Sequence, residues 1–175
     1  SQFFFSQTSR FIYQVTMKPD KDNKADVKTE MAYLDVSPEK SLFYGENMMK
    51  RDSVMQRMRS TRNFDPSVFQ NYRSSIDFVV EKDLVNQKVF LKQRIARDQY
   101  QYEEDRPLEW KILPEIIQID DYKAQKAETT FAGRTWYAWF TADIPFQDGP
   151  YKFSGLPGLI IKLEDSNGDY SFDLK

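Results

Sequence analysis

The sequence contains neither histidine nor cysteine in its 175 residues. These two absences exclude Ser-His-Asp and Cys-His catalytic groups, thiolate chemistry, and the usual ligands of zinc, haem and iron–sulfur clusters. A chain without cysteine also fits an oxidising compartment, where an unpaired thiol is a hazard. We therefore expect a protein that is not an enzyme and that uses no metal and no cofactor.

The chain also lacks a long apolar run and a strong excess of one charge. No stretch of 18 apolar residues occurs, so the protein is not expected to span a membrane, and no charged-then-apolar leader is visible. A mature exported protein whose signal peptide has been removed would look the same. The net charge of -2 gives little electrostatic support to a nucleic-acid partner.

What the chain has in quantity is aromatic residues, with 14 Phe and 10 Tyr, which favours β-strands. The length predicts one domain, residues 1–175, with a substantial core. Successive alternating segments joined by short links predict an antiparallel meander in an α+β fold. The expected strands are residues 10–17, 29–36, 41–44, 75–81, 88–95, 108–113, 116–127, 134–141, 159–164 and 169–174.

Residues 46–62 are the one segment with helical spacing, because Met48, Met55 and Met58 recur at helical intervals. The expected helix packs these methionines on the sheet and turns its basic residues outward. A membrane-surface or partner-binding helix is the alternative. Methionine also suits an adaptable apolar cavity.

The stretch "PYKFSGLPGLIIKLED", residues 150–165, places glycine and proline directly before branched aliphatic residues. Leu156, Pro157, Gly158 and Leu159 fit a type II turn, with glycine at the position of positive φ. The turn is either a corner that fixes the register of the following strand or a loop that meets a ligand. The residues of this structural motif are Gly149, Pro150, Gly155, Leu156, Pro157, Gly158, Leu159 and Ile160.

The segment from Ala132 to Asp165 resembles the signature of the GLPGLI family of uncharacterised Bacteroidetes envelope proteins, whose name is spelled by residues 155–160. The likeness extends through "YKAQKAETTF" and, more loosely, to "RFIYQV". It implies an exported protein in the periplasm, at the outer membrane or outside the cell, and it supplies no catalytic residues. By analogy with small envelope carriers it also implies a strongly curved, open, half-barrel-like sheet packed on one main helix. Family members are often longer, so truncation after Lys175 is open.

Acidic residues suggest two further sites, each with a plainer explanation. Residues 165–169 space oxygen ligands like a calcium loop, but glycine comes too early, and Asn167-Gly168 predicts a two-residue type I′ hairpin instead. Acidic and aromatic residues between 100 and 110 resemble a glycosidase site, although such clusters are usually solvated loops. The members of this second cluster are Tyr100, Tyr102, Glu103, Glu104, Asp105, Glu109 and Trp110.

Strand 134–141 carries aromatic residues on both faces, so it is either covered twice or lines a cleft. The first functional hypothesis is a non-catalytic module that binds a lipid or another apolar or amphipathic molecule. The alternative is an accessory protein for an outer-membrane assembly or transporter, and a remote alternative is a glycan-acting enzyme. The candidate ligand-binding residues are Met48, Met55, Met58, Trp136, Trp139 and Phe140.

Overall fold

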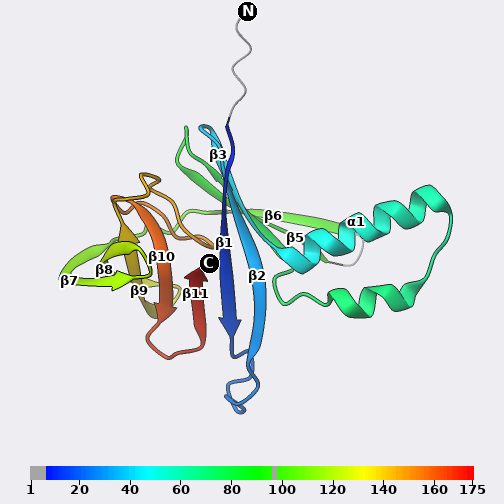
Figure 1. Ribbon diagram of the computed structural model, residues 1–175, viewed down its shortest axis with the longest axis horizontal. Coiled ribbons are helices and arrows are strands. Elements are labelled where there is room, and N and C mark those ends of the chain that lie inside the picture. The colour runs from blue at the N-terminus through cyan, green and yellow to red at the C-terminus, as the bar shows by residue number, and fades with distance from the viewer. Residues whose placement is uncertain (1–6, 96–97) are drawn as a thin grey trace, which may run out of the picture.

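The fold comes from a computed structural model that describes residues 7–95 and 98–175. Within these residues, eleven strands form one antiparallel sheet, and the first and last strands pair at its centre (Figure 1). One meander runs outward from this pair through β2 to β6, and the other runs through β10 back to β7. The strands are β1 Ser9–Met17, β2 Lys28–Val36, β3 Lys40–Gly45, β4 Phe78–Asp83, β5 Lys88–Ile95, β6 Asp98–Glu104, β7 Lys111–Ile119, β8 Tyr122–Phe131, β9 Arg134–Thr141, β10 Leu159–Asp165 and β11 Tyr170–Leu174.

Alternation in the sequence sets the buried face of the central strands. Tyr13, Val15 and Met17 of β1 are buried, whereas the residues between them are half-buried. The expected mostly antiparallel α+β fold is thus confirmed. In β10 a bulge between Ile160 and Lys162 breaks the alternation, so that Ile160 and Ile161 are both buried.

Helix α1, Glu46–Thr61, begins where expected but buries none of its side chains. It contacts β2, β3 and the 3₁₀ helix η1, Pro66–Tyr72, and its far end projects away from the sheet (Figure 1). Contacts near its start hold it, since Tyr33 donates a hydrogen bond to Glu46 and Asn47 donates one to the carbonyl of Arg73. The expectation that the helix packs its methionines on the sheet is wrong, because charged residues interrupt the apolar spacing and leave no continuous stripe.

Three local predictions fail for identifiable reasons. Strand β6 was not predicted, because it has no buried face and so no alternation marks it. The segment 116–127 is two strands, β7 and β8, that turn at Asp120, whose φ is 50°. The hairpin after β10 exists, but Gly168 alone of the Asn-Gly pair has positive φ, and Asp165 accepts hydrogen bonds from two backbone amides of the turn, so the type I′ assignment is wrong.

Candidate functional site

The connection between β9 and β10, residues 142–158, packs against buried side chains of the sheet, and we call it the inner loop. Its residues Phe153 and Leu156 are buried, and the Phe153 ring contacts Trp136 with a centroid distance of 4.9 Å. Backbone hydrogen bonds tie it together, including one from Gly155 to Gln147. The loop is therefore part of the core and brings its polar groups inside.

Lys82 of β4 fixes the inner loop from the other half of the sheet. Its side chain is 3% exposed, and its ammonium donates to the Asp148 carboxylate at 2.6 Å and to the carbonyls of Gly149 and Phe153 at 2.7 and 2.9 Å. All three ammonium protons are thus used. Burial lowers the pKa of Lys82, and the pairing with Asp148 opposes this effect.

The glycines of the motif allow close backbone approach. A Cβ at Gly158, whose φ is 148°, would lie 2.0 Å from the Thr141 carbonyl oxygen, and one at Gly149 would lie 2.8 Å from the Ile160 side chain. The predicted type II turn is wrong. The amide of Gly158 donates to Leu156, which closes a three-residue turn around Pro157, and the amide of Leu159 donates to Ile144 instead.

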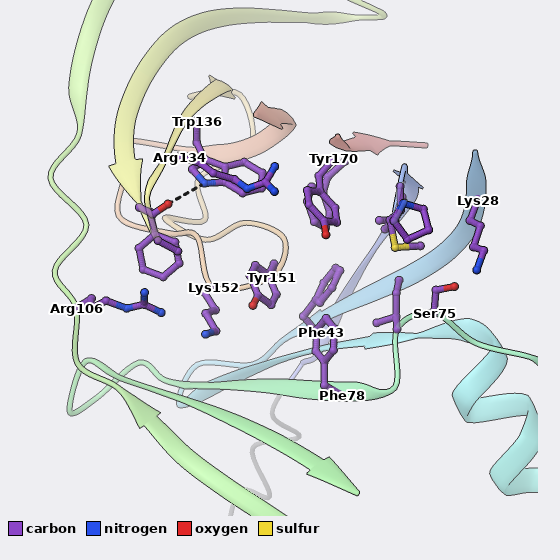
Figure 2. A pocket seen from close by; sticks show the side chains of 17 residues that line it. Lys28, Phe43, Ser75, Phe78, Arg106, Arg134, Trp136, Tyr151, Lys152 and Tyr170 are labelled. Carbon is purple, nitrogen blue, oxygen red and sulfur yellow. Dashed lines mark hydrogen bonds between the residues drawn. The ribbon is translucent and has the colours of Figure 1, made fainter. Parts of the chain in front are cut away.

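A cavity of about 350 Å³ lies beside the inner loop, and we call it the inner cavity (Figure 2). Its walls are mainly aromatic and aliphatic, and they come from both halves of the sheet and from the loop. Aromatic contacts hold the walls in place, such as Tyr151 against Phe78 at 5.4 Å. The lining residues are Val15, Met17, Pro19, Lys28, Phe43, Ser75, Ile76, Phe78, Arg106, Phe131, Ala132, Arg134, Trp136, Tyr151, Lys152, Tyr170 and Phe172.

Among the described residues, the charged groups that line the cavity are all basic, and two of them share one carboxylate. Arg106 binds both oxygens of Glu104 at 2.6 and 2.8 Å, and the buried Lys152 binds the same carboxylate at 2.7 Å and the Tyr102 hydroxyl. The hydrogen bonds from Arg106, and to a smaller extent the hydrogen bond from Lys152, lower the pKa of Glu104 to about 2. Burial lowers the pKa of Lys152, but its bonds to Glu104 and Tyr102 outweigh burial and raise it overall, so the ammonium keeps its proton.

The other two basic residues differ in their surroundings. Arg134 lies beside Trp136 in the cavity wall (Figure 2) and is neutralised by Asp165 at 2.7 Å and Asp169 at 2.8 Å. These same pairs account for the carboxylates of the supposed calcium loop. Lys28 is exposed on the opposite side of the cavity from Arg106 (Figure 2).

The predicted ligand-binding residues do not gather in one place. Trp136 lines the inner cavity, whereas Trp139 and Phe140 are buried in the core without lining it. Two of the three methionines, Met48 and Met55, line a separate groove of about 890 Å³ between α1 and strands β3 to β6, and Met58 is half-buried on α1. Burial of Trp136, Trp139 and Phe140 agrees with the expectation of a strand covered on both faces.

The groove beside α1 differs from the inner cavity in its chemistry. Its lining carries charges of both signs. The basic residues are Arg51, Arg59, Lys92 and Arg94, and Glu81 is one of the acidic residues. Such a surface suits solvent or a polar partner better than an apolar ligand. In the acidic and aromatic cluster of residues 100–110, Glu104 and Tyr102 both bind Lys152, and the Trp110 indole donates to the carbonyl of Ser154.

Sequence reasoning missed Lys82, Arg106 and Lys152. Lys82 shares the inward face of β4 with Phe78 and Val80, and a charge at an inward position of an alternating strand is a usable signal. No group of three acidic side chains within residues 7–95 and 98–175 is placed to hold a metal ion. In the same residues, neither helix has the length and apolar character to cross a bilayer.

A comparison of the sequence with protein families gives a partial match. A family model described as "Protein of unknown function (Porph_ging)" matches residues 118–162. The match contains the glycine-rich motif and fits an uncharacterised Bacteroidetes family, but it does not carry the GLPGLI name expected from the sequence. A search of curated proteins found no match.

Solved structures that resemble the chain include two of PNGF-II, in the P21 and C2 space groups. Each has a TM-score of 0.64 and 18% identity, and each comparison covers 97% of this chain. The chain corresponds to only 28% and 27% of those two chains, so it spans little more than a quarter of their length. At this identity the likeness shows the fold alone.

Proposed function

We propose that the protein is a non-catalytic binding module whose inner cavity holds a compact apolar or amphipathic molecule. The observation that carries this proposal is a hollow of about 350 Å³ inside the sheet, walled by aromatic rings from both halves of the fold. That volume falls within the range of small-molecule sites, at its lower end. Among the described residues that line the cavity none is acidic, and the sequence contains no histidine and no cysteine.

A strongly curved sheet is part of the proposal, and the chain length between the two edge strands supports it. Eleven strands laid flat would measure about 48 Å across. The link from Glu104 at the end of β6 to Lys111 at the start of β7 can reach about 25 Å at most. This difference supports a sheet that curves so that its two edges approach each other.

The proposed location is the cell envelope, as an exported protein of the GLPGLI type. The partial match to an uncharacterised family that fits Bacteroidetes supports this proposal. Fractionation of the native organism tests it, and recovery in the cytosol would contradict it.

A fluorescence titration with the neutral probe N-phenyl-1-naphthylamine tests ligand binding. Ser75 lines the cavity and is exposed, so Ser75→Trp should put a bulky side chain into the cavity, and Ser53→Trp on α1 is the matched control. We expect saturable binding to the parent and the control, and binding at least about tenfold weaker to Ser75→Trp, a loss of about 1.4 kcal/mol. Equal affinity for all three proteins would contradict the proposal.

The projecting helix α1 supports a second candidate, an accessory role at an outer-membrane protein. The helix buries none of its side chains and carries Arg51 and Arg59 in the groove beside it. An affinity pulldown from native membranes with the parent and with the double variant Arg51→Glu, Arg59→Glu tests this role. Failure of the parent to recover an outer-membrane protein would contradict this role, and recovery of the same protein by both would contradict the part assigned to α1.

A further inference from the structure

We propose that the ligand of the inner cavity carries an anionic group, a carboxylate, sulfonate or phosphate, which binds at the end formed by Arg106 and Lys152. The inference rests on the proposed function, because it specifies the ligand of that same cavity. It starts from the charge of the lining: among the described lining residues four are basic and none is acidic, and most of the others are apolar or aromatic.

Within residues 7–95 and 98–175, the Arg106–Lys152 end has one positive charge more than its acidic partner neutralises. Two cations share the single carboxylate of Glu104, and both lie on the same side of the cavity (Figure 2). Lys152 is 3% exposed, and its raised pKa keeps it charged. A partly desolvated cation with an incomplete set of anionic partners binds an incoming anion more strongly than a surface lysine does.

Both cations also have hydrogen-bond donors to spare. Arg106 uses Nε and Nη2 for Glu104, and within the described residues its Nη1 group donates to no acceptor. Lys152 uses two of its three N–H bonds, for Glu104 and the Tyr102 hydroxyl. Side chains of this kind accommodate an oxyanion without breaking the pairs already present.

The ring of Phe131 joins this charged end to the apolar walls. The Arg106 guanidinium lies 4.6 Å and the Lys152 ammonium 5.9 Å from its centroid. A ligand with its anionic group between the cations therefore places the adjoining carbon atoms against an aromatic wall. Arg134 is a weaker anchor, since two carboxylates already neutralise it, and Lys28 stands alone on the opposite side.

A pair of probes with the same ring system tests the assignment. N-phenyl-1-naphthylamine is neutral, and 8-anilinonaphthalene-1-sulfonate adds one sulfonate to it. We expect the sulfonate to bind the parent about tenfold more tightly, as one charge-assisted hydrogen bond would give. Arg106→Gln should reduce this preference to about threefold or less, whereas Arg57→Gln, on the exposed surface of α1, should leave it unchanged.

The outcomes separate this inference from the proposed function. Equal affinities for the two probes, with both blocked by Ser75→Trp, would overturn the inference and leave the cavity as a binding site for neutral molecules. Failure of both probes to bind would overturn both proposals. A sulfonate preference that survives Arg106→Gln would overturn the assignment to this end.

A measurement on the parent protein tests the inference without relying on the stability of a variant. Raising the salt concentration should weaken the sulfonate and spare the neutral probe, because screening acts on charge alone. A sulfonate affinity that does not change with salt would overturn the inference.

Discussion

Replacing Lys82 by Met should cost the fold about 3–5 kcal/mol. The change keeps the length and apolar stem of the side chain but removes three hydrogen bonds, each shorter than 3 Å. It leaves the Asp148 carboxylate, which is 4% exposed, without its cation, and leaves two carbonyls of the inner loop without their donor. The cost thus comes mainly from the stranded buried groups.

Chemical denaturation with urea measures this cost, and Lys92→Met on the neighbouring strand is the control. Lys92 pairs with Glu81 at 2.8 Å, but its side chain is 41% exposed, so its loss should cost less than about 1 kcal/mol. In thermal unfolding, Lys82→Met should lower Tm by about 6–20 °C. Adding Asp148→Leu to Lys82→Met should recover part of the loss, since no charge is then stranded. Equal small losses for Lys82→Met and Lys92→Met would refute the reasoning.

Three further predictions concern the inner loop and Glu104, the carboxylate that binds Lys152 of that loop. Gly158→Ala should lower the free energy of unfolding in urea by about 3 kcal/mol or more, because the new Cβ would meet the Thr141 carbonyl. Gly155→Ala has open space around the new Cβ, so it should cost only about 1–2 kcal/mol of backbone strain. Equal costs for the two variants would contradict this prediction. Leu156→Ala should cost about 2–5 kcal/mol because Leu156 is 1% exposed, and an unchanged stability would contradict its place in the core. The pKa of Glu104 is about 2 in the folded protein against an ordinary 4.5, so its contribution to stability is full above pH 4.5 and is lost as the pH falls towards 2. Glu104→Gln should therefore make the fall in the free energy of unfolding over this pH range shallower. An identical slope for the parent and the variant would contradict the pairing.

The sequence predicts most of the fold where a strand has one buried face. The predicted bounds of strands 88–95 and 134–141 are the same as the observed bounds. Strand β6 was missed because an edge strand of polar residues buries neither face and so leaves no alternation. The end of helix α1 was predicted to within one residue, but its packing was predicted wrongly, since helical spacing predicts the element and not what it packs against.

The candidate site could be predicted only in part, because its decisive contacts join distant residues. Trp136 was expected in an apolar site and lines the inner cavity. Lys82 and Asp148 lie 66 positions apart, and Lys152 and Glu104 lie 48 apart, so no local pattern reports either pair. The glycine-rich motif lies in the segment that forms the inner loop. The close approach of residue 158 to β9 explains why this position is glycine better than the expected turn does.

The most direct test of ligand binding in the inner cavity is NMR of the protein with ¹³C-labelled methionine methyl groups, titrated with N-phenyl-1-naphthylamine. Met17 lines the inner cavity, and Met48 and Met55 line the groove beside α1, so the methionines report on the two places separately. Our account predicts a saturable shift of the Met17 methyl signal and intermolecular contacts to it, with Met48 and Met55 unchanged. Shifts confined to Met48 and Met55, or no shift at saturating probe, would contradict it.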